Sequence, residues 1–277
     1  MSETVPCQPL SAAGEPWQTG RMTKHQWLWM GCAAASVLTG TACSGTDTPT
    51  ANDYDDVAQA LGSVTVTGDG GGEIRAIVDV SAIASGAPAD GITLKATGDF
   101  SGTHLGLTYD YRLRCADAGG KALAACGSGA DSAGVNIEWS GELATGVLDA
   151  TVHRTGELEL SQIQSGTIHI AGRSSLELAA SFDAVLADAS RSYALKYDAD
   201  YRDLRVQQSP LRVLAGSIHA AVDVERKATD GSRTSDANFE IDAEIVFGSD
   251  GHATLTLDGA HHYAIDMQSA SVTRSNK

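Results

Sequence analysis

Most of the chain alternates between apolar and polar residues with a period of two. From Leu105 to Arg114, every second residue is Leu or Tyr, and the residues between them are polar or glycine. The same alternation recurs in residues 193–202, 218–225, 240–247 and 263–268. This pattern is typical of antiparallel strands that have one dry face and one solvated face.

Clusters of turn residues separate the alternating stretches at hairpin distances. They lie at residues 68–72, 88–91, 119–120, 230–231, 249–251 and 258–259. The segment 68–72 is expected to join two strands, and about 13 strands are expected over residues 63–273. A meander of this length buries its dry faces only by curving or folding over. We therefore predict an all-β, antiparallel fold that forms a sandwich, a half-barrel or a barrel.

A helical pattern precedes the strands at residues 52–62. Asn and Asp residues occupy its start, Val57 and Leu61 lie on one apolar stripe, and a glycine follows the last apolar residue. The acidic residues suit the positive end of a helix dipole. We expect one short N-terminal helix that docks on the sheet through its apolar stripe.

The segment 27–38 is apolar except for Ser36, and it follows the basic residues Arg21 and Lys24. A membrane-spanning helix needs about 20 apolar residues, whereas the apolar region of a signal peptide needs roughly 7 to 15 behind a positive start. The segment therefore predicts a signal peptide, and hence export.

The residues that follow, Leu-Thr-Gly-Thr-Ala-Cys at 38–43, resemble the lipobox of bacterial lipoproteins. The resemblance covers the signal and the cleavage site only, and Gly40 stands where the family more often has leucine. It implies that Cys43 becomes the first mature residue and carries a lipid on its thiol. Because Ser44 follows rather than Asp, it also implies an outer-membrane location in a Gram-negative cell. The alternatives are an ordinary secretory signal cut near Ala42 and an uncleaved anchor.

These features divide the chain into four expected parts. The first 21 residues are polar, and Met22 begins a better signal peptide, so we interpret 1–21 as a start-site extension. The other parts are a lipoprotein signal peptide at 22–42, the lipidated cysteine with a flexible tether at 43–51, and one all-β domain with its leading helix at 52–277.

The composition narrows the set of partners. The chain has 35 acidic and 19 basic residues, for a formal charge of −16, and only 5% of its residues are aromatic. Such a surface repels phosphate, so nucleic acid is not an expected partner. The expected partners are a membrane, reached through the lipid anchor, and an apolar ligand or another protein.

Of the five cysteines, two remain after removal of the signal peptide and lipidation of Cys43. These two, Cys115 and Cys126, lie eleven positions apart on either side of a Gly-Gly turn. An exported chain meets an oxidising compartment, so we predict that they form a disulfide rather than two free thiols.

The histidines are the first group with possible chemistry. His153, His169 and His219 fall on polar positions of expected strands and can bind zinc only if those strands are neighbours. Solvated histidines explain the same positions, so we predict no metal site.

Carboxylates occur in spacings that also suit chemistry. Glu157 with Glu159, and Asp198 with Asp200, share a strand face, which permits acid–base work or simply solvation. The acids at 53, 55 and 56 permit calcium, but the glycine and closing glutamate of an EF-hand are missing. Motifs of hydrolases, zinc peptidases and nucleotide-binding proteins are also absent from the sequence. We predict a non-enzyme without a cofactor.

Two functions from different classes agree with these observations. The first is an exported, lipid-anchored lipoprotein whose β domain is a structural or protein-binding module at the cell envelope. The alternative is a periplasmic carrier of an apolar ligand or acyl chain, similar in architecture to the lipoprotein-localisation carriers, and a third is a hydrolase or sugar-binding protein on a jelly-roll-like frame. The small residues Ala199, Ala220 and Ala243 leave room for either a ligand or opposing strands.

Overall fold

The fold is described from a computed structural model of residues 1–277. It describes residues 47–66, 72–144, 148–183, 189–230 and 232–275, which belong to one compact unit. Cys43, the expected signal peptide at 22–42 and the expected extension at 1–21 lie outside the described residues.

Two helices precede twelve strands in the described part of the chain. The helices are α1 (Ala51–Thr65) and α2 (Gly72–Ser85). The strands are β1 (Ile92–Ala96), β2 (Asp99–His104), β3 (Leu107–Ala116), β4 (Ser132–Ala144), β5 (Asp149–Ser161), β6 (Thr167–Asp183), β7 (Ala189–Gln208), β8 (Leu211–Asp230), β9 (Arg233–Phe247), β10 (His252–Leu257), β11 (His261–Asp266) and β12 (Val272–Arg274). Within the described ranges, neither helix is long and apolar enough to cross a membrane.

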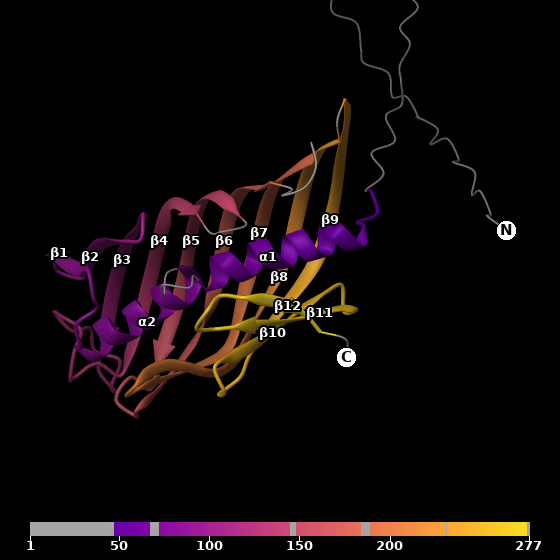
Figure 1. The fold of residues 1–277 in the computed structure, drawn as a ribbon. Helices are drawn as coiled ribbons and strands as arrows, with labels where there is room; N and C mark the ends of the chain where they lie inside the picture. The colour runs from indigo at the N-terminus through magenta and orange to yellow at the C-terminus, as the bar shows by residue number, and fades with distance from the viewer. Residues whose placement is uncertain (1–46, 67–71, 145–147, 184–188, 231, 276–277) are drawn as a thin grey trace, which may run out of the picture. The chain divides into compact units, whose positions relative to one another are not determined.

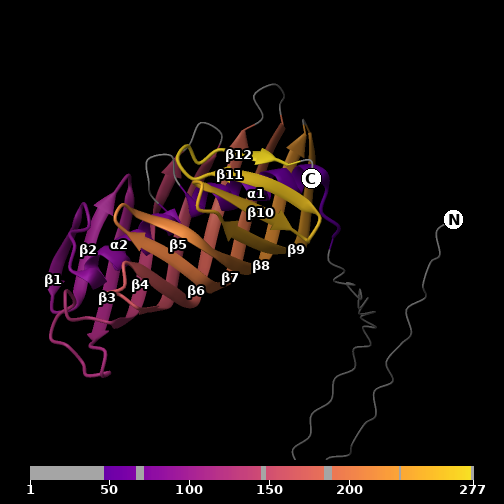
Figure 2. The same cartoon turned by 90° about the horizontal axis from the view of Figure 1, so that it is seen from below.

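All twelve strands form one antiparallel sheet in sequence order. The predicted all-β antiparallel meander is therefore confirmed. Among the described residues, β1 pairs only with β2 and β12 only with β11, so the sheet does not close. Figures 1 and 2 show that it curves into an open half-barrel.

Bulges in the long middle strands produce part of this curvature. The register shifts at Gly172 in β6 and between Arg202 and Val206 in β7. At Gly172, which has φ 151°, an added Cβ would lie 2.2 Å from the Glu157 carbonyl oxygen, so glycine is required there. Such shifts bend the strands away from a flat sheet.

Both helices lie on one face of the sheet, which we call the inner face; the opposite face is the outer face (Figure 1). The short strands β10–β12 curl over α1, so that α1 has part of the sheet on two sides (Figure 2). Tyr193 of β7 and Tyr263 of β11 both donate hydrogen bonds to α1, at 3.0 Å to Asp53 and 2.8 Å to Asp55. The sheet thus encloses the helices, and its inner-face side chains form the core with them.

The second helix corrects the sequence prediction for residues 63–85. We expected strands from residue 63 and a hairpin at 68–72, but α1 continues to Thr65 and α2 begins at Gly72. The β-branched residues of α2 favour strands locally. However, Ile77, Val80 and Ala84 lie on one helical stripe and are fully buried. Burial of this stripe against the sheet outweighs the local preference.

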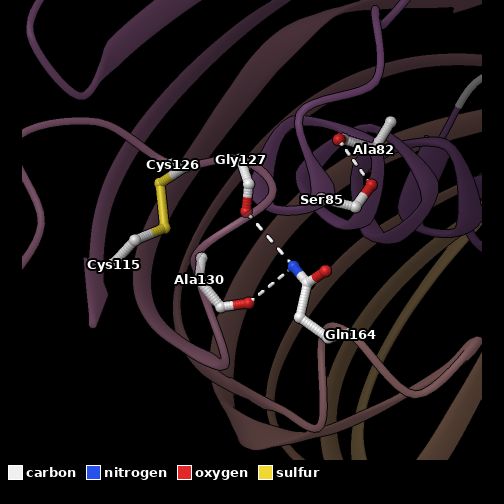
Figure 3. The surroundings of a disulfide bond; sticks show 7 residues. All are labelled: Ala82, Ser85, Cys115, Cys126, Gly127, Ala130 and Gln164. Atoms are coloured by element: carbon white, nitrogen blue, oxygen red, sulfur yellow. Dashed lines mark hydrogen bonds between the residues drawn. A yellow bond between two sulfur atoms is a disulfide. The ribbon is translucent and has the colours of Figure 1, made fainter. Parts of the chain in front are cut away.

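The predicted disulfide between Cys115 and Cys126 is present, with its Cα atoms 5.3 Å apart. It closes a loop between β3 and β4 beside the C-terminal turn of α2 (Figure 3). The Gln164 side chain donates hydrogen bonds to the carbonyl oxygens of Gly127 (3.2 Å) and Ala130 (2.8 Å), just beyond the disulfide. The disulfide and this glutamine therefore hold the loop in place at one end of the half-barrel.

Replacing both Cys115 and Cys126 by alanine should lower the free energy of unfolding by about 2–3 kcal/mol, because the unfolded chain loses a closed loop. Urea denaturation of the two proteins measures this difference. Dithiothreitol should destabilise the parent protein by a similar amount and leave the double variant unchanged. Equal stability of the parent with and without reductant would contradict the expected role.

Candidate functional site

An ion pair lies buried between the inner face and α2. Arg154 of β5 and Glu73 of α2 are 0% and 2% exposed, and their nearest nitrogen and oxygen are 2.7 Å apart. The same guanidinium nitrogen donates a hydrogen bond of 2.9 Å to the Tyr201 hydroxyl on β7. That hydroxyl lies 2.8 Å from the Ser174 hydroxyl on β6. The pair thus belongs to a polar cluster drawn from four elements.

A row of small residues makes room for this cluster. Gly156, Ser174 and Ala199 are cross-strand neighbours on β5, β6 and β7. An added Cβ at Gly156 would lie 3.1 Å from the Arg154 guanidinium. The row continues through Ala220 of β8 and Ala243 of β9. The inward alanines noted in the sequence are therefore one continuous strip, and α2 contacts this part of the sheet.

The cluster does not satisfy all of its polar atoms. Among the described residues, Arg154 Nε and Nη1 and Glu73 Oε2 are buried and have no hydrogen-bond partner. Such a group costs about 1–3 kcal/mol when it stays unpaired. Burial raises the pKa of the Glu73 carboxyl, and the Arg154 charge opposes this shift. Tyr201 and Trp139 also act on the Glu73 carboxyl and lower its pKa, whereas two nitrogens of Arg154 are used by neither Glu73 nor Tyr201.

A second set of charges fixes the start of α1. Asp53 is 1% exposed, forms a capping box with Thr50, and lies 3.0 Å from Arg226 of β8. Burial raises the pKa of Asp53, but hydrogen bonds from Thr50 and Arg226 lower it by more, so the carboxyl stays ionised below its usual pKa.

The calcium alternative does not agree with these contacts. Asp56 pairs with Arg191 of β7, and Asp55 accepts its hydrogen bond from Tyr263 of β11. Asp53 and Asp56 also share the Tyr193 hydroxyl of β7, so the acids at 53, 55 and 56 are used in contacts to basic and tyrosine side chains of β7, β8 and β11. Within the described ranges, no group of three or more His, Cys, Asp and Glu side chains is placed to hold a metal ion.

The outer face carries a broad groove over β1–β7 with a volume of about 970 Å³. Its charged lining residues are the acids Asp99, Asp110, Glu138, Glu157, Asp198 and Asp200 and the bases Lys95, Arg112 and Arg173. Both members of the Asp198–Asp200 pair lie in it, whereas Glu157 lies in it without Glu159. We call this surface the charged groove.

Hydrogen bonds hold several of these side chains in place. Arg112 donates to Asp99 at 2.8 Å, and Arg173 donates to Asp200 at 3.1 Å. These contacts leave an excess of carboxylates in the groove, because six acids face three bases. The arrangement therefore suits binding of a cationic group.

The three strand histidines do not converge. His169 of β6 lies 3.4 Å from Asp203, and His219 of β8 lies 3.1 Å from Glu244. His153 of β5 stands opposite Glu177 of β6 rather than opposite His169. The structure therefore gives no support to the zinc alternative.

Sequence reasoning did not identify Arg154 or Glu73, although a signal was present. In β5, Val152 and Leu158 point inward, and Arg154 lies on the same phase. A charged residue on the dry phase of a strand requires a buried partner. The pairing with Glu73 could not be predicted, because the sequence pattern places Glu73 at the start of a strand and not on a helix that covers the sheet.

Comparisons with protein-family models, with curated protein sequences and with solved structures found no match to this chain.

Replacing Arg154 with methionine should lower the free energy of unfolding by about 3–5 kcal/mol, because the Glu73 carboxylate is left buried and unpaired. The double variant Arg154→Met with Glu73→Leu should be more stable than Arg154→Met alone. Urea denaturation followed by fluorescence of Trp139, the one tryptophan beyond residue 42, measures both effects. If the changes in unfolding free energy of Arg154→Met and of Glu73→Leu alone add up to that of the double variant, the two side chains are not coupled.

Proposed function

We propose that this protein is an exported, lipid-anchored lipoprotein that binds a protein partner through the charged groove and catalyses no reaction. The observation that carries the proposal is the groove itself, a hollow of about 970 Å³ in which six carboxylates face three bases. A lipid on Cys43 would hold the domain at the cell envelope, where such a partner is met.

The charge of the groove indicates the chemistry of the partner. The salt bridges to Asp99 and Asp200 already occupy Arg112 and Arg173. In the described part of the chain, Asp110 and Glu138 form no ion pair and are open to a partner. A segment rich in lysine or arginine therefore complements the groove, and charge attraction speeds its association.

The helices on the inner face leave the outer face as the surface for a protein partner. Val57, Val64 and Ile77 of the two helices are fully buried against it. A protein partner cannot reach that face while the helices occupy it. The outer face, which is solvated on every strand from β3 to β9, is the surface left for a large partner.

The groove variant combines three substitutions: Glu138→Gln, Glu157→Gln and Asp198→Asn. It should bind a fluorescein-labelled octalysine peptide about tenfold more weakly than the parent. Three carboxylates are lost, and each exposed ion pair contributes about 0.2–1 kcal/mol. Fluorescence anisotropy at low salt measures the dissociation constant.

The matched control is Asp223→Asn, Glu240→Gln, Asp242→Asn on the outer face of β8 and β9, which removes the same charge outside the groove. It should change the dissociation constant by less than about twofold, because screening weakens distant charges. Equal weakening by both variants would show that net charge alone attracts the peptide, and the proposal would fail.

The second candidate, a carrier of an acyl chain, is favoured by the unpaired atoms of Arg154. A fatty-acid carboxylate has the same chemistry as the Glu73 side chain and can replace it at the guanidinium. The inner face beneath the helices is apolar and carries the strip of small residues that an alkyl chain needs. In this function α2 moves aside, and Glu73 occupies the site between ligands.

The carrier function predicts opposite effects of two substitutions on the binding of dansyl-undecanoate. Glu73→Gln should tighten binding about tenfold, since it frees the charge of Arg154, and Arg154→Met should abolish binding. Fluorescence titration measures both, and circular dichroism checks that the variants are folded. No saturable binding by the parent or by Glu73→Gln would exclude the carrier function.

A further inference from the structure

The described chain enters the fold along β9. The backbone N–H of Asp47 donates to the Asn238 carbonyl oxygen at 2.8 Å, and the Asp47 carboxylate accepts from the Asn238 N–H at 2.9 Å. β10 pairs with β9 only from Ala243 to Phe247, so this part of the β9 edge is open to residue 47. The chain preceding α1 thus adds to the sheet edge by hydrogen bonds.

The residues after Asp47 also make specific contacts with the domain. Thr50 caps α1, and Asp53 lies buried against Arg226 of β8. The segment expected to be a flexible tether, 43–51, is therefore bonded to β9 at Asp47 and ends at α1, which begins at Ala51.

The covalent chain then limits the distance between a lipid and the domain. Cys43 precedes Asp47 by four residues, and such a stretch spans at most about 14 Å when fully extended. Resting on the lipid anchor of the proposed function, we propose that the end of the β8–β9 hairpin, residues 227–230 and 232–237, contacts the surface of the bilayer.

The charge and exposure of this hairpin end suit an anionic lipid surface. Arg226 is paired with the buried Asp53, and in the rest of this hairpin end Lys227 and Arg233 balance Asp230 and Asp236, whereas the whole chain carries −16. From Arg233 to Asp236, consecutive residues of β9 are exposed on both faces, so the end extends beyond the helix-filled core. Anionic headgroups are therefore repelled less by this balanced hairpin end than by the chain as a whole, and they attract Lys227 and Arg233.

This orientation also places the charged groove. Figure 1 shows β1–β3 at the opposite end of the sheet from β9 and from the start of α1. With the β8–β9 end on the bilayer, the groove over β1–β7 lies away from the membrane and is open to a partner.

The test uses the full-length protein, expressed with its signal and reconstituted into phosphatidylethanolamine–phosphatidylglycerol vesicles that contain a nitroxide-headgroup lipid. Ser235→Cys places a fluorophore on the hairpin end, and Thr93→Cys places one on the equally exposed edge strand β1. Each added cysteine is the one free thiol once Cys43 is acylated and the disulfide has formed. We expect strong quenching at position 235 and none at position 93.

A Gly/Ser insert of about 12 residues between Thr46 and Asp47 adds about 20 Å of reach and should abolish the quenching at 235. A mass without an acyl group on Cys43 would overturn the lipid anchor and the orientation together. Acylated protein with equal quenching at 93 and 235, or with quenching unchanged by the insert, would overturn the orientation alone.

Discussion

The fold depends on the way that two acidic helices dock on a sheet that presents basic and tyrosine side chains inward. Glu73 meets Arg154, Asp53 meets Arg226, and Asp79 of α2 accepts a hydrogen bond from Tyr111 of β3 at 3.1 Å. A carboxylate under a sheet is stable only with a charged or donating partner. Each of these contacts therefore specifies where along the half-barrel a helix lies, in addition to whatever stability it contributes.

An open sheet needs the two helices to cover its inner face, because it cannot bury that face by closing on itself. The long strands β6 to β8 pair with register shifts, and β10–β12 turn over α1, so the helices become the centre of one shared core. The strip of small residues lets α2 approach the sheet, and the larger residues on either side fill the remaining space. The helices thus do for this sheet what barrel closure or a second sheet does in other β proteins.

The strands could be predicted because each one repeats the same local rule, as in β3, where Tyr109 and Tyr111 point inward and Asp110 points outward. The disulfide could be predicted from the spacing of Cys115 and Cys126 together with the expected export of the chain. α2 could not be predicted, because Ile and Val favour strands locally. The helix is stabilised by burial of its apolar stripe against the sheet, and the local sequence does not show that contact. The buried Arg154–Glu73 cluster and the charged groove could not be predicted either, because both depend on the register between neighbouring strands. The inward position of Ala199 could be inferred from the sequence, but only strand pairing shows that it continues Gly156 and Ser174 in one strip.

The two faces of the sheet separate two kinds of electrostatics. Outward carboxylates such as Glu138 are exposed to water, where the field of a charge extends over a Debye length of about 8 Å. Inward charges such as Arg154 are removed from water, so they interact strongly with their neighbours and require a paired opposite charge. The outer face therefore suits recruitment of a charged partner, and the inner face suits an exchange between one internal carboxylate and another. The two proposed functions would use different surfaces, so a partner at the charged groove would leave the buried pair undisturbed.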